Sequence, residues 1–543
     1  MNDKLVKLFL LLILPLSLYF SVSYLKQFQG PYFYGTNADP DYVYLLNSLN
    51  VARLKLPGHI DHPGTPVQII GAFTIKLTHL FAGKGKIVDD VLARPEVYIQ
   101  ILNSVFLVLT VITLFVCGWL VWLFSKQIEM ALLFQTAPFF TVVPELLLKV
   151  STEPTLVISC LIFSTLVLRV FIKEDMDENK NGYLMGFAFL SAFGVATKIT
   201  FFPLIIIPIA LLKLWRDKFY FSILFAITFC ILAFPLVFQW EYFRDWLHGL
   251  FLGAGVYGSG KQTVIDPLSF FQNILKIFST EFVFNIILLG VTIFLIGRFF
   301  YRPLREYFRH HSIRCKIIFL SAIIFCIYLV IISKHYHYRY MIPPVIFSVV
   351  TLVGGGIVIQ DVFRNKKHYK VLLFFLIVVI IINQTYSFQE TKSQLKQDLC
   401  GQSELLALIK KKYPSGIKVY SYGSSCPQQA FSLALGYCYL EQSTYTNVLK
   451  KIYPKTYFYN IWTKSFFLWI PSMTIDIEEI LKEEKDVYFH VSNLEENGLA
   501  LDGKIPILDF TSGKPTGKFL YLKNLNRGKD YRETVYKLER IGQ

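Results

Sequence analysis

The stretch "DPDYVYLLNSLNVARLKLPGHIDHPGTPVQIIGA", residues 39–72, follows shortly after an N-terminal apolar run and decides how the chain is interpreted. It places acids at its start, histidines in its middle and prolines throughout. Proline and glycine at such spacing predict short helices joined by a tight turn. A simple connector between two apolar runs would not need this set of residues.

The composition indicates a membrane protein. Of the 543 residues, 54% are hydrophobic and only 17% are charged, whereas soluble domains carry about 25% charged residues. Several apolar runs approach the roughly 20 residues that a helix needs to cross a bilayer. The net charge of +16 lies in short loops between these runs, which is typical of membrane topology and argues against a nucleic-acid partner.

The apolar runs predict about eleven transmembrane helices. The first, at 5–25, resembles a signal peptide but lacks a small-x-small cleavage site, so we expect a retained anchor. The predicted spans are 5–25, 98–124, 128–146, 153–172, 183–198, 200–215, 219–239, 283–299, 315–333, 340–360 and 371–388.

The distribution of basic residues predicts the orientation. With the N-terminus inside, the inner loops and span ends between 125 and 388 hold seventeen lysines and arginines, and the outer ones hold seven. Cytoplasmic loops are the more basic ones. We therefore expect a multi-pass protein of the cytoplasmic (inner) membrane with a cytoplasmic N-terminus and an extracytoplasmic C-terminal region.

This orientation divides the chain into two domains. The transmembrane domain, 1–388, has two large outer loops at 26–97 and 240–282. The region 389–543 alternates helix-like and strand-like segments, such as "SELLALIKKKY", "IKVYSYG", "DVYFHVS", "IPILDF" and "KFLYLKN". This alternation predicts a small extracytoplasmic α/β domain.

The first outer loop predicts two helices on the membrane surface. Asp39-Pro40 is a helix start, with the acid as N-cap, and Thr65-Pro66 starts a second helix that ends at Gly83. Asp41 is the more telling acid, because one cap does not need a second acid two positions later. Asp39 either caps the helix or acts in a site.

The turn between these helices holds His59, Asp61 and His62. They could bind a metal, donate to phosphate, or lie at a wet interface. No CxxC or Cys/His spacing indicates a structural zinc site. Among Cys400, Cys426 and Cys438, one disulfide is compatible with an extracytoplasmic location.

These motifs resemble those of membrane glycosyltransferases of the GT-C fold, in the bacterial group related to protein O-mannosyltransferases and aminoarabinose transferases. The shared layout is an acidic motif after the first span, a tyrosine, a short helix and a proline-rich turn. Asp-Pro-Asp stands here for the usual Asp-Glu, and Pro-Gly-Thr-Pro for Pro-Pro-Leu. Later matches are "KVSTEPTLVISCLIF", "GVATKITFFPL" and "KHYHYRYMIPP".

The resemblance implies transfer of a sugar from a polyprenyl-phosphate carrier to a glycan, lipid or protein acceptor on the outer face of the membrane. Asp41, or Asp39, is then the general base. The implied acceptor or metal site comprises Glu153, His59, Asp61 and His62, and the cofactor is either a divalent metal ion or none. The implied ligands of the donor phosphate are Lys198, Arg339, Lys261 and His337.

Simpler roles exist for several of these residues. Lys198 and Arg339 could snorkel to lipid headgroups, Glu153 could cap its helix, and Lys261 could lie in a flexible connector. Two other functions are a transporter or flippase of lipid-linked sugars and a non-catalytic envelope assembly protein. A transporter would place ionisable residues in mid-span, whereas the charges here lie at the outer span ends.

Overall fold

The computed structural model describes most of the chain, namely residues 3–34, 40–141, 143–176, 179–253, 263–363, 366–412, 416–460, 463–483, 486–492, 504–508, 515–524 and 533–540. Within these residues, seven helical segments are long and apolar enough to cross a membrane. They are α1 (Asp3–Gln29), α5 (Pro95–Ser125), α8 (Thr152–Lys173), α15 (Phe282–Phe300), α17 (Ser312–Lys334), the segment Tyr338–Val362 and the segment Leu373–Ala407.

The chain is thus an α-helical multi-pass membrane protein, as predicted, but the seven segments are fewer than the eleven predicted spans. Proline explains part of the difference, because it removes a backbone donor and breaks helices. The run 128–146 is divided at Pro138 and Pro144 into short pieces, and 200–215 contains Pro203 and Pro208. The pieces are α6 (Ile128–Gln135), η1 (Ala137–Phe139), α7 (Val143–Leu146), η2 (Ile199–Ile205) and α10 (Ile206–Leu211).

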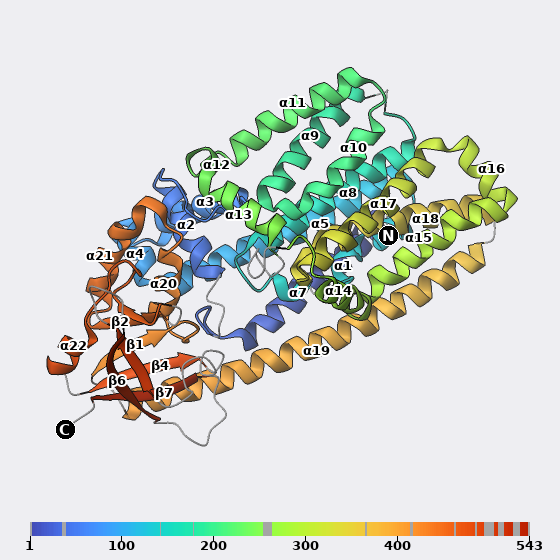
Figure 1. Cartoon of the computed structure of the whole chain (residues 1–543). Helices are drawn as coiled ribbons and strands as arrows, with labels where there is room; N and C mark the ends of the chain where they lie inside the picture. Colours follow the sequence, from blue (N-terminus) through green and yellow to red (C-terminus); the bar gives the residue numbers. More distant parts are fainter. Residues whose placement is uncertain are drawn as a thin grey trace.

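The remaining helices of the membrane part fill the space around these spans (Figure 1). They are α2 (Asp41–Ala52), α3 (Thr65–Ala82), α4 (Ile87–Ala93), α9 (Lys180–Thr197), α11 (Trp215–Leu232), α12 (Pro235–Phe238), α13 (Trp240–Leu252), α14 (Pro267–Thr280) and α16 (Arg302–His310). The span Tyr338–Val362 itself consists of η4 (Tyr338–Met341) and nearly all of α18 (Ile342–Phe363).

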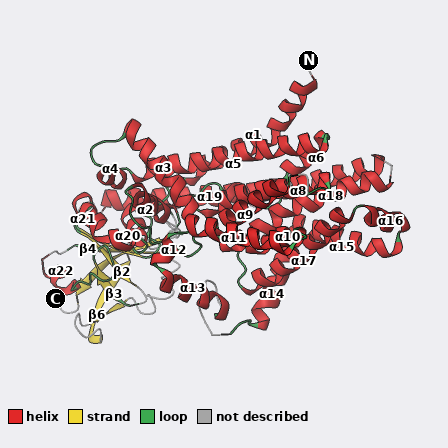
Figure 2. Cartoon of the chain, turned by 90° about the horizontal axis from the view of Figure 1, so that it is seen from above, coloured by secondary structure: helices red, strands yellow, loops and turns green. Residues whose placement is uncertain are grey.

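The C-terminal region contains a seven-stranded mixed sheet at one end of the helical bundle (Figure 2). Its order is β3-β2-β1-β4-β7-β6-β5, in which β2, β1 and β4 are parallel and the other pairs antiparallel. The strands are β1 (Ile417–Ser421), β2 (Thr456–Asn460), β3 (Ser465–Phe467), β4 (Val487–Ser492), β5 (Lys504–Leu508), β6 (Pro515–Asn524) and β7 (Glu533–Arg540). The helices are α20 (Pro427–Leu435), η5 (Tyr439–Glu441), α21 (Gln442–Ile452) and α22 (Ile477–Glu483).

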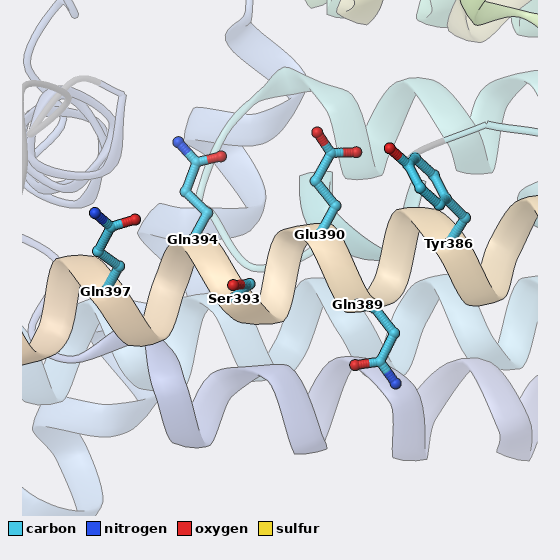
Figure 3. A pocket seen from close by; sticks show the side chains of 6 residues that line it. All are labelled: Tyr386, Gln389, Glu390, Ser393, Gln394 and Gln397. Carbon is cyan, nitrogen blue, oxygen red and sulfur yellow. The ribbon is translucent and has the colours of Figure 1, made fainter.

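One long helix, α19 (Lys366–Lys412), joins the membrane part to this sheet (Figure 1). The predicted domain boundary at 388/389 falls inside it, because the apolar segment continues into a polar one without a proline. A groove along α19 is lined by six residues of this helix alone, and Gln389 points away from the other labelled side chains (Figure 3). A groove that one helix lines by itself does not form an enclosed site.

The helix α2, which was predicted to lie on the membrane surface, is covered by the C-terminal region. Eleven of its twelve residues are buried. The Asn50 amide donates to the Cys438 carbonyl over 3.1 Å, and the ring of Tyr42 packs edge-on against Phe431 at 4.9 Å. Polar residues of α2 thus contact protein as well as its apolar ones. All eight cysteines are free, so the disulfide considered among Cys400, Cys426 and Cys438 is not formed.

Candidate functional site

Charged side chains from several distant segments meet where helices of the bundle end. Glu153 lies in the first turn of α8, and Lys198 directly follows α9. Arg339 lies in η4, after α17 ends, and His62 lies in the turn before α3. We call Glu153, Lys198, Arg339, His62 and His337 the span-end cluster.

The centre of the cluster is a buried ion pair. Lys198 Nζ donates to Glu153 Oε1 over 2.5 Å, and the two side chains are 3% and 2% exposed. The ring of Tyr340 lies 5.3 Å from Lys198 Nζ, in the range of a cation–π contact. Glu153 is therefore more than a helix cap, and Lys198 does not snorkel to the headgroups: each holds the other at a fixed place in the interior.

His62 is held beside this pair by the turn between α2 and α3. The turn is fixed because Asn47 Oδ1 accepts from the amides of Gly58 (2.7 Å) and His59 (3.1 Å). At its end Gly64 has a φ of +65°, which favours glycine. Burial, followed by the positive charge of Lys198, holds the pKa of His62 well below its usual value. His62 is therefore neutral near pH 7.

Arg339 and His337 form the more accessible side of the cluster. Both are half-buried, and the Arg339 amide donates to His337 Nδ1 over 3.3 Å. Burial, with the charges of Arg339 and Lys198, lowers the pKa of His337 to about 4. The cluster therefore contains two cations, one carboxylate and two neutral imidazoles, and its named members carry a net positive charge.

Asp41 lies next to the start of α8, at the first residue of α2. Its Oδ1 accepts from the backbone amide of Val150 over 2.6 Å, and its side chain is buried. Val150 precedes Glu153 by three residues, so this bond ties the acid to the same helix start. Gly64, at the end of the His62 turn, lies against Tyr44 of α2: a Cβ at Gly64 would lie 3.1 Å from the Tyr44 hydroxyl. The His62 turn therefore lies beside the helix that begins with Asp41.

A second carboxylate near Asp41 was missed by the sequence analysis. Glu96 accepts from the Tyr32 amide and from the Tyr42 hydroxyl, both over 2.8 Å. Burial raises the pKa of Tyr32, and the charges of Asp41 and Glu96 raise it further, which places both acids close to Tyr32. Glu96 follows Arg94-Pro95 at a helix start, where an acid is common, so no local pattern distinguishes it.

The other predicted residues that the structure describes contact aromatic side chains. His59 packs edge-on between the rings of Tyr44 and Tyr437, each at 5.1 Å. Asp61 accepts from the Tyr242 hydroxyl over 3.0 Å, on the side of α13. Asp39 and Lys261 lie outside the described residues.

A metal ion has no set of ligands among the described residues, because no group of three or more His, Cys, Asp or Glu side chains converges there. In the span-end cluster, Glu153 is engaged by Lys198. The two histidines lie beside lysine and arginine cations, which do not favour a further cation. The predicted grouping of Glu153, His59, Asp61 and His62 as metal ligands thus does not fit the described geometry.

No protein-family model matches the sequence, and no curated protein matches it. Two solved structures are similar over most of the chain. The crystal structure of ArnT from Cupriavidus metallidurans bound to undecaprenyl phosphate has 10% sequence identity and a TM-score of 0.49, and the match covers 99% of this chain and 98% of that one. The apo crystal structure of ArnT from the same organism has 10% identity and a TM-score of 0.45, with coverage of 92% and 93%.

Proposed function

We propose that this chain is a membrane glycosyltransferase that moves a sugar from a polyprenyl-phosphate carrier to an acceptor hydroxyl on the outer face of the cytoplasmic membrane. The main support for this proposal is that a buried carboxylate, Asp41, and the net positive span-end cluster both lie at the start of α8. A transfer of this kind needs a base for the acceptor and cations for the leaving phosphate.

The charge of the cluster suits the donor. A polyprenyl-phosphate sugar is a phosphodiester with one negative charge, and a second charge develops on its phosphate as the sugar leaves. Arg339, with its planar fork of donors, is the group for direct contact with two phosphate oxygens. Lys198 supplies a nearby point charge whose position is fixed by Glu153.

Asp41 is the proposed general base. The proton of the acceptor hydroxyl passes to a carboxylate oxygen of Asp41 as the hydroxyl oxygen bonds to the anomeric carbon. The bond between that carbon and the phosphate oxygen breaks, and its electron pair stays with polyprenyl phosphate. The proton on Asp41 then returns to water or to the phosphate, so the enzyme is unchanged.

Tyr32, Tyr42 and Glu96 hold the surroundings of Asp41 rather than the substrate. Glu96 ties the loop at Tyr32 to α2 through its two hydrogen bonds. We expect Tyr32, which lies near both acids, to limit the access of water to Asp41. Exclusion of water strengthens every charge interaction in the site.

The orientation also belongs to this proposal. The residues of the site lie at the starts of α2 and α8 and at the ends of α9 and α17. The opposite ends hold a separate network in which Arg314 bonds Glu174 (2.9 Å) and Asp361 (3.0 Å). The positive-inside pattern supports a cytoplasmic location for that second end and an outer location for the site.

The experiment is a lipid and glycan profile of the source cells with and without the gene. Loss of the chain should cause a polyprenyl-phosphate sugar to accumulate and a sugar to disappear from one envelope acceptor. Complementation with the wild-type chain should reverse both changes, and the Asp41→Asn chain should reverse neither. An unchanged profile would exclude the transferase. Accumulation of the same lipid only in the inner leaflet would instead indicate a flippase.

A further inference from the structure

A cavity of about 360 Å³ lies in the C-terminal region, away from the span-end cluster. It is lined by Leu406, Lys410, Lys418, Tyr420, Ser424, Ser425, Cys426, His490 and Glu533. Most of these residues are buried, although they are polar. Folding places polar groups in an interior only where something satisfies them, so the cavity needs a functional explanation.

The topology of the sheet places the cavity at a point where ligands bind in other α/β proteins. From β1 the chain passes to β2 on one side, whereas β4 pairs with β1 on the other, so the strand order reverses between β1 and β4. Crevices at the carboxyl ends of parallel strands beside such a reversal are frequent binding sites. Ser424 and Ser425 follow β1, and Glu533 lies opposite Ser492 at the carboxyl end of β4.

His490 supplies an independent sign of a ligand. It lies on β4 with 3% exposure, and its ring is 4.9 Å from that of Tyr420. Its Nε2 has no hydrogen-bond partner among the described residues. Leaving such a nitrogen buried and unsatisfied costs about 1–3 kcal/mol. Burial and the charge of Lys418 lower the pKa of His490 to about 3, so the neutral ring has one donor and one acceptor nitrogen.

The other polar groups of the cavity include both hydrogen-bond donors and hydrogen-bond acceptors. Lys418 and Lys410 bring ammonium donors, Lys410 from the end of α19, where it is exposed. Glu533 brings a buried carboxyl group, which accepts from the Ser425 amide over 2.7 Å. Donors and acceptors around one small space suit sugar hydroxyls, because each hydroxyl both donates and accepts. The two lysines outnumber the acid, which favours a ligand with a negative charge.

We propose that this cavity, defined by His490, Lys418, Lys410 and Glu533, binds a single sugar unit that carries an acidic group. Its hydroxyls face His490, Ser424 and Glu533, and its acidic group faces the two lysines. The volume is at the lower end of the roughly 300–1,000 Å³ of small-molecule pockets, so one sugar ring fits and a lipid chain does not. This inference is independent of the proposed transfer reaction, because it concerns equilibrium binding to the C-terminal region.

The test is calorimetric titration of the full chain in detergent with three probes. Galacturonate has the ring hydroxyls and the acid, galactose has the hydroxyls alone, and acetate has the acid alone. We expect galacturonate to bind at least tenfold more tightly than either of the others. Lys418→Gln should weaken galacturonate about tenfold, because a hydrogen bond to a charged group is lost, and should leave galactose unchanged.

Two further variants complete the design. His490→Asn should weaken both sugars, and Lys450→Gln, an exposed lysine of α21 outside the cavity, should change nothing. Equal affinities for acetate and galacturonate would show a site that binds any small anion. Equal affinities for galactose and galacturonate would show that the two lysines do not select an acidic sugar. Either result overturns the proposal, as does the absence of binding by the wild-type chain. Lys418 is only half-buried, so its variant should fold even if the His490 variant does not.

Discussion

The buried ion pair between Lys198 and Glu153 allows a prediction in which stability and transfer respond differently. The two side chains are 3% and 2% exposed and 2.5 Å apart, so solvent screening does not reduce their interaction. Removing one partner of such a pair leaves a buried charge without compensation, at a cost of about 3–5 kcal/mol. Replacing both by apolar residues of similar size is often neutral or stabilising.

We therefore expect Lys198→Met and Glu153→Leu each to lower the free energy of unfolding by about 3–5 kcal/mol, whereas the double variant lies close to the wild type. Sugar transfer should remain impaired in the double variant, because that variant still lacks the cation near the leaving phosphate. Its turnover should fall about 10- to 100-fold, which corresponds to a loss of about 1.4–2.7 kcal/mol of electrostatic stabilisation of the leaving phosphate.

The assay is reversible unfolding in mixed micelles with increasing dodecyl sulfate, together with sugar transfer by the same preparations. The control is Lys7→Met, which breaks the ion pair of Lys7 with Asp3 at 2.5 Å near the start of α1. Because these side chains are 32% and 79% exposed, that loss should be about 1 kcal/mol or less. A double variant as unstable as the sum of the two single variants would refute the reasoning, and so would full transfer by a stable double variant.

Two further predictions concern stability. Burial raises the pKa of Glu533 to about 7. The folded chain therefore keeps a proton on Glu533 that the unfolded chain releases above about pH 4.5. As the pH rises from 4.5 to 7, the C-terminal region should lose up to about 3 kcal/mol of stability. Unfolding of the wild type and of Glu533→Gln at pH 5 and pH 7.5 checks this, and an equal pH dependence in both would contradict it. Gly64→Ala should cost about 1–2 kcal/mol, because φ is +65° and the new Cβ would lie 3.1 Å from the Tyr44 hydroxyl. The control is Gly85→Ala, where φ is +67° and the space around the new Cβ is open. It should cost only the backbone strain of about 1 kcal/mol and leave sugar transfer unchanged. Equal effects of the two substitutions on sugar transfer would show that the Tyr44 contact is unimportant.

Local patterns predicted the parts of the fold that depend on neighbouring residues. The apolar runs indicated the membrane helices, and Thr65-Pro66 with Gly83 marked the ends of α3. The strand-like segments at 417, 486, 505 and 518 correspond to β1, β4, β5 and β6. The strands β2, β3 and β7 were not identified, because their pairing depends on distant partners.

The site was predictable where an unusual polar residue stood at a span end or in the first outer loop. Glu153, Lys198 and Arg339 are charges beside apolar runs, and the structure brings these three and His62 together. Asp61 has the same local pattern as His62, yet its partner is Tyr242 on another helix. Which residues of a turn face the interior is decided by tertiary packing, and so is the burial of α2 under α20.

The most direct test of the account is the rate of sugar transfer by purified Asp41→Asn protein, compared with wild type and with Asp61→Asn. The amide keeps the size of the side chain and can still accept from the Val150 amide, so the fold should persist. The account predicts a loss of about 10²–10⁴-fold for Asp41→Asn and little change for Asp61→Asn. Wild-type transfer by a correctly folded Asp41→Asn chain would contradict it.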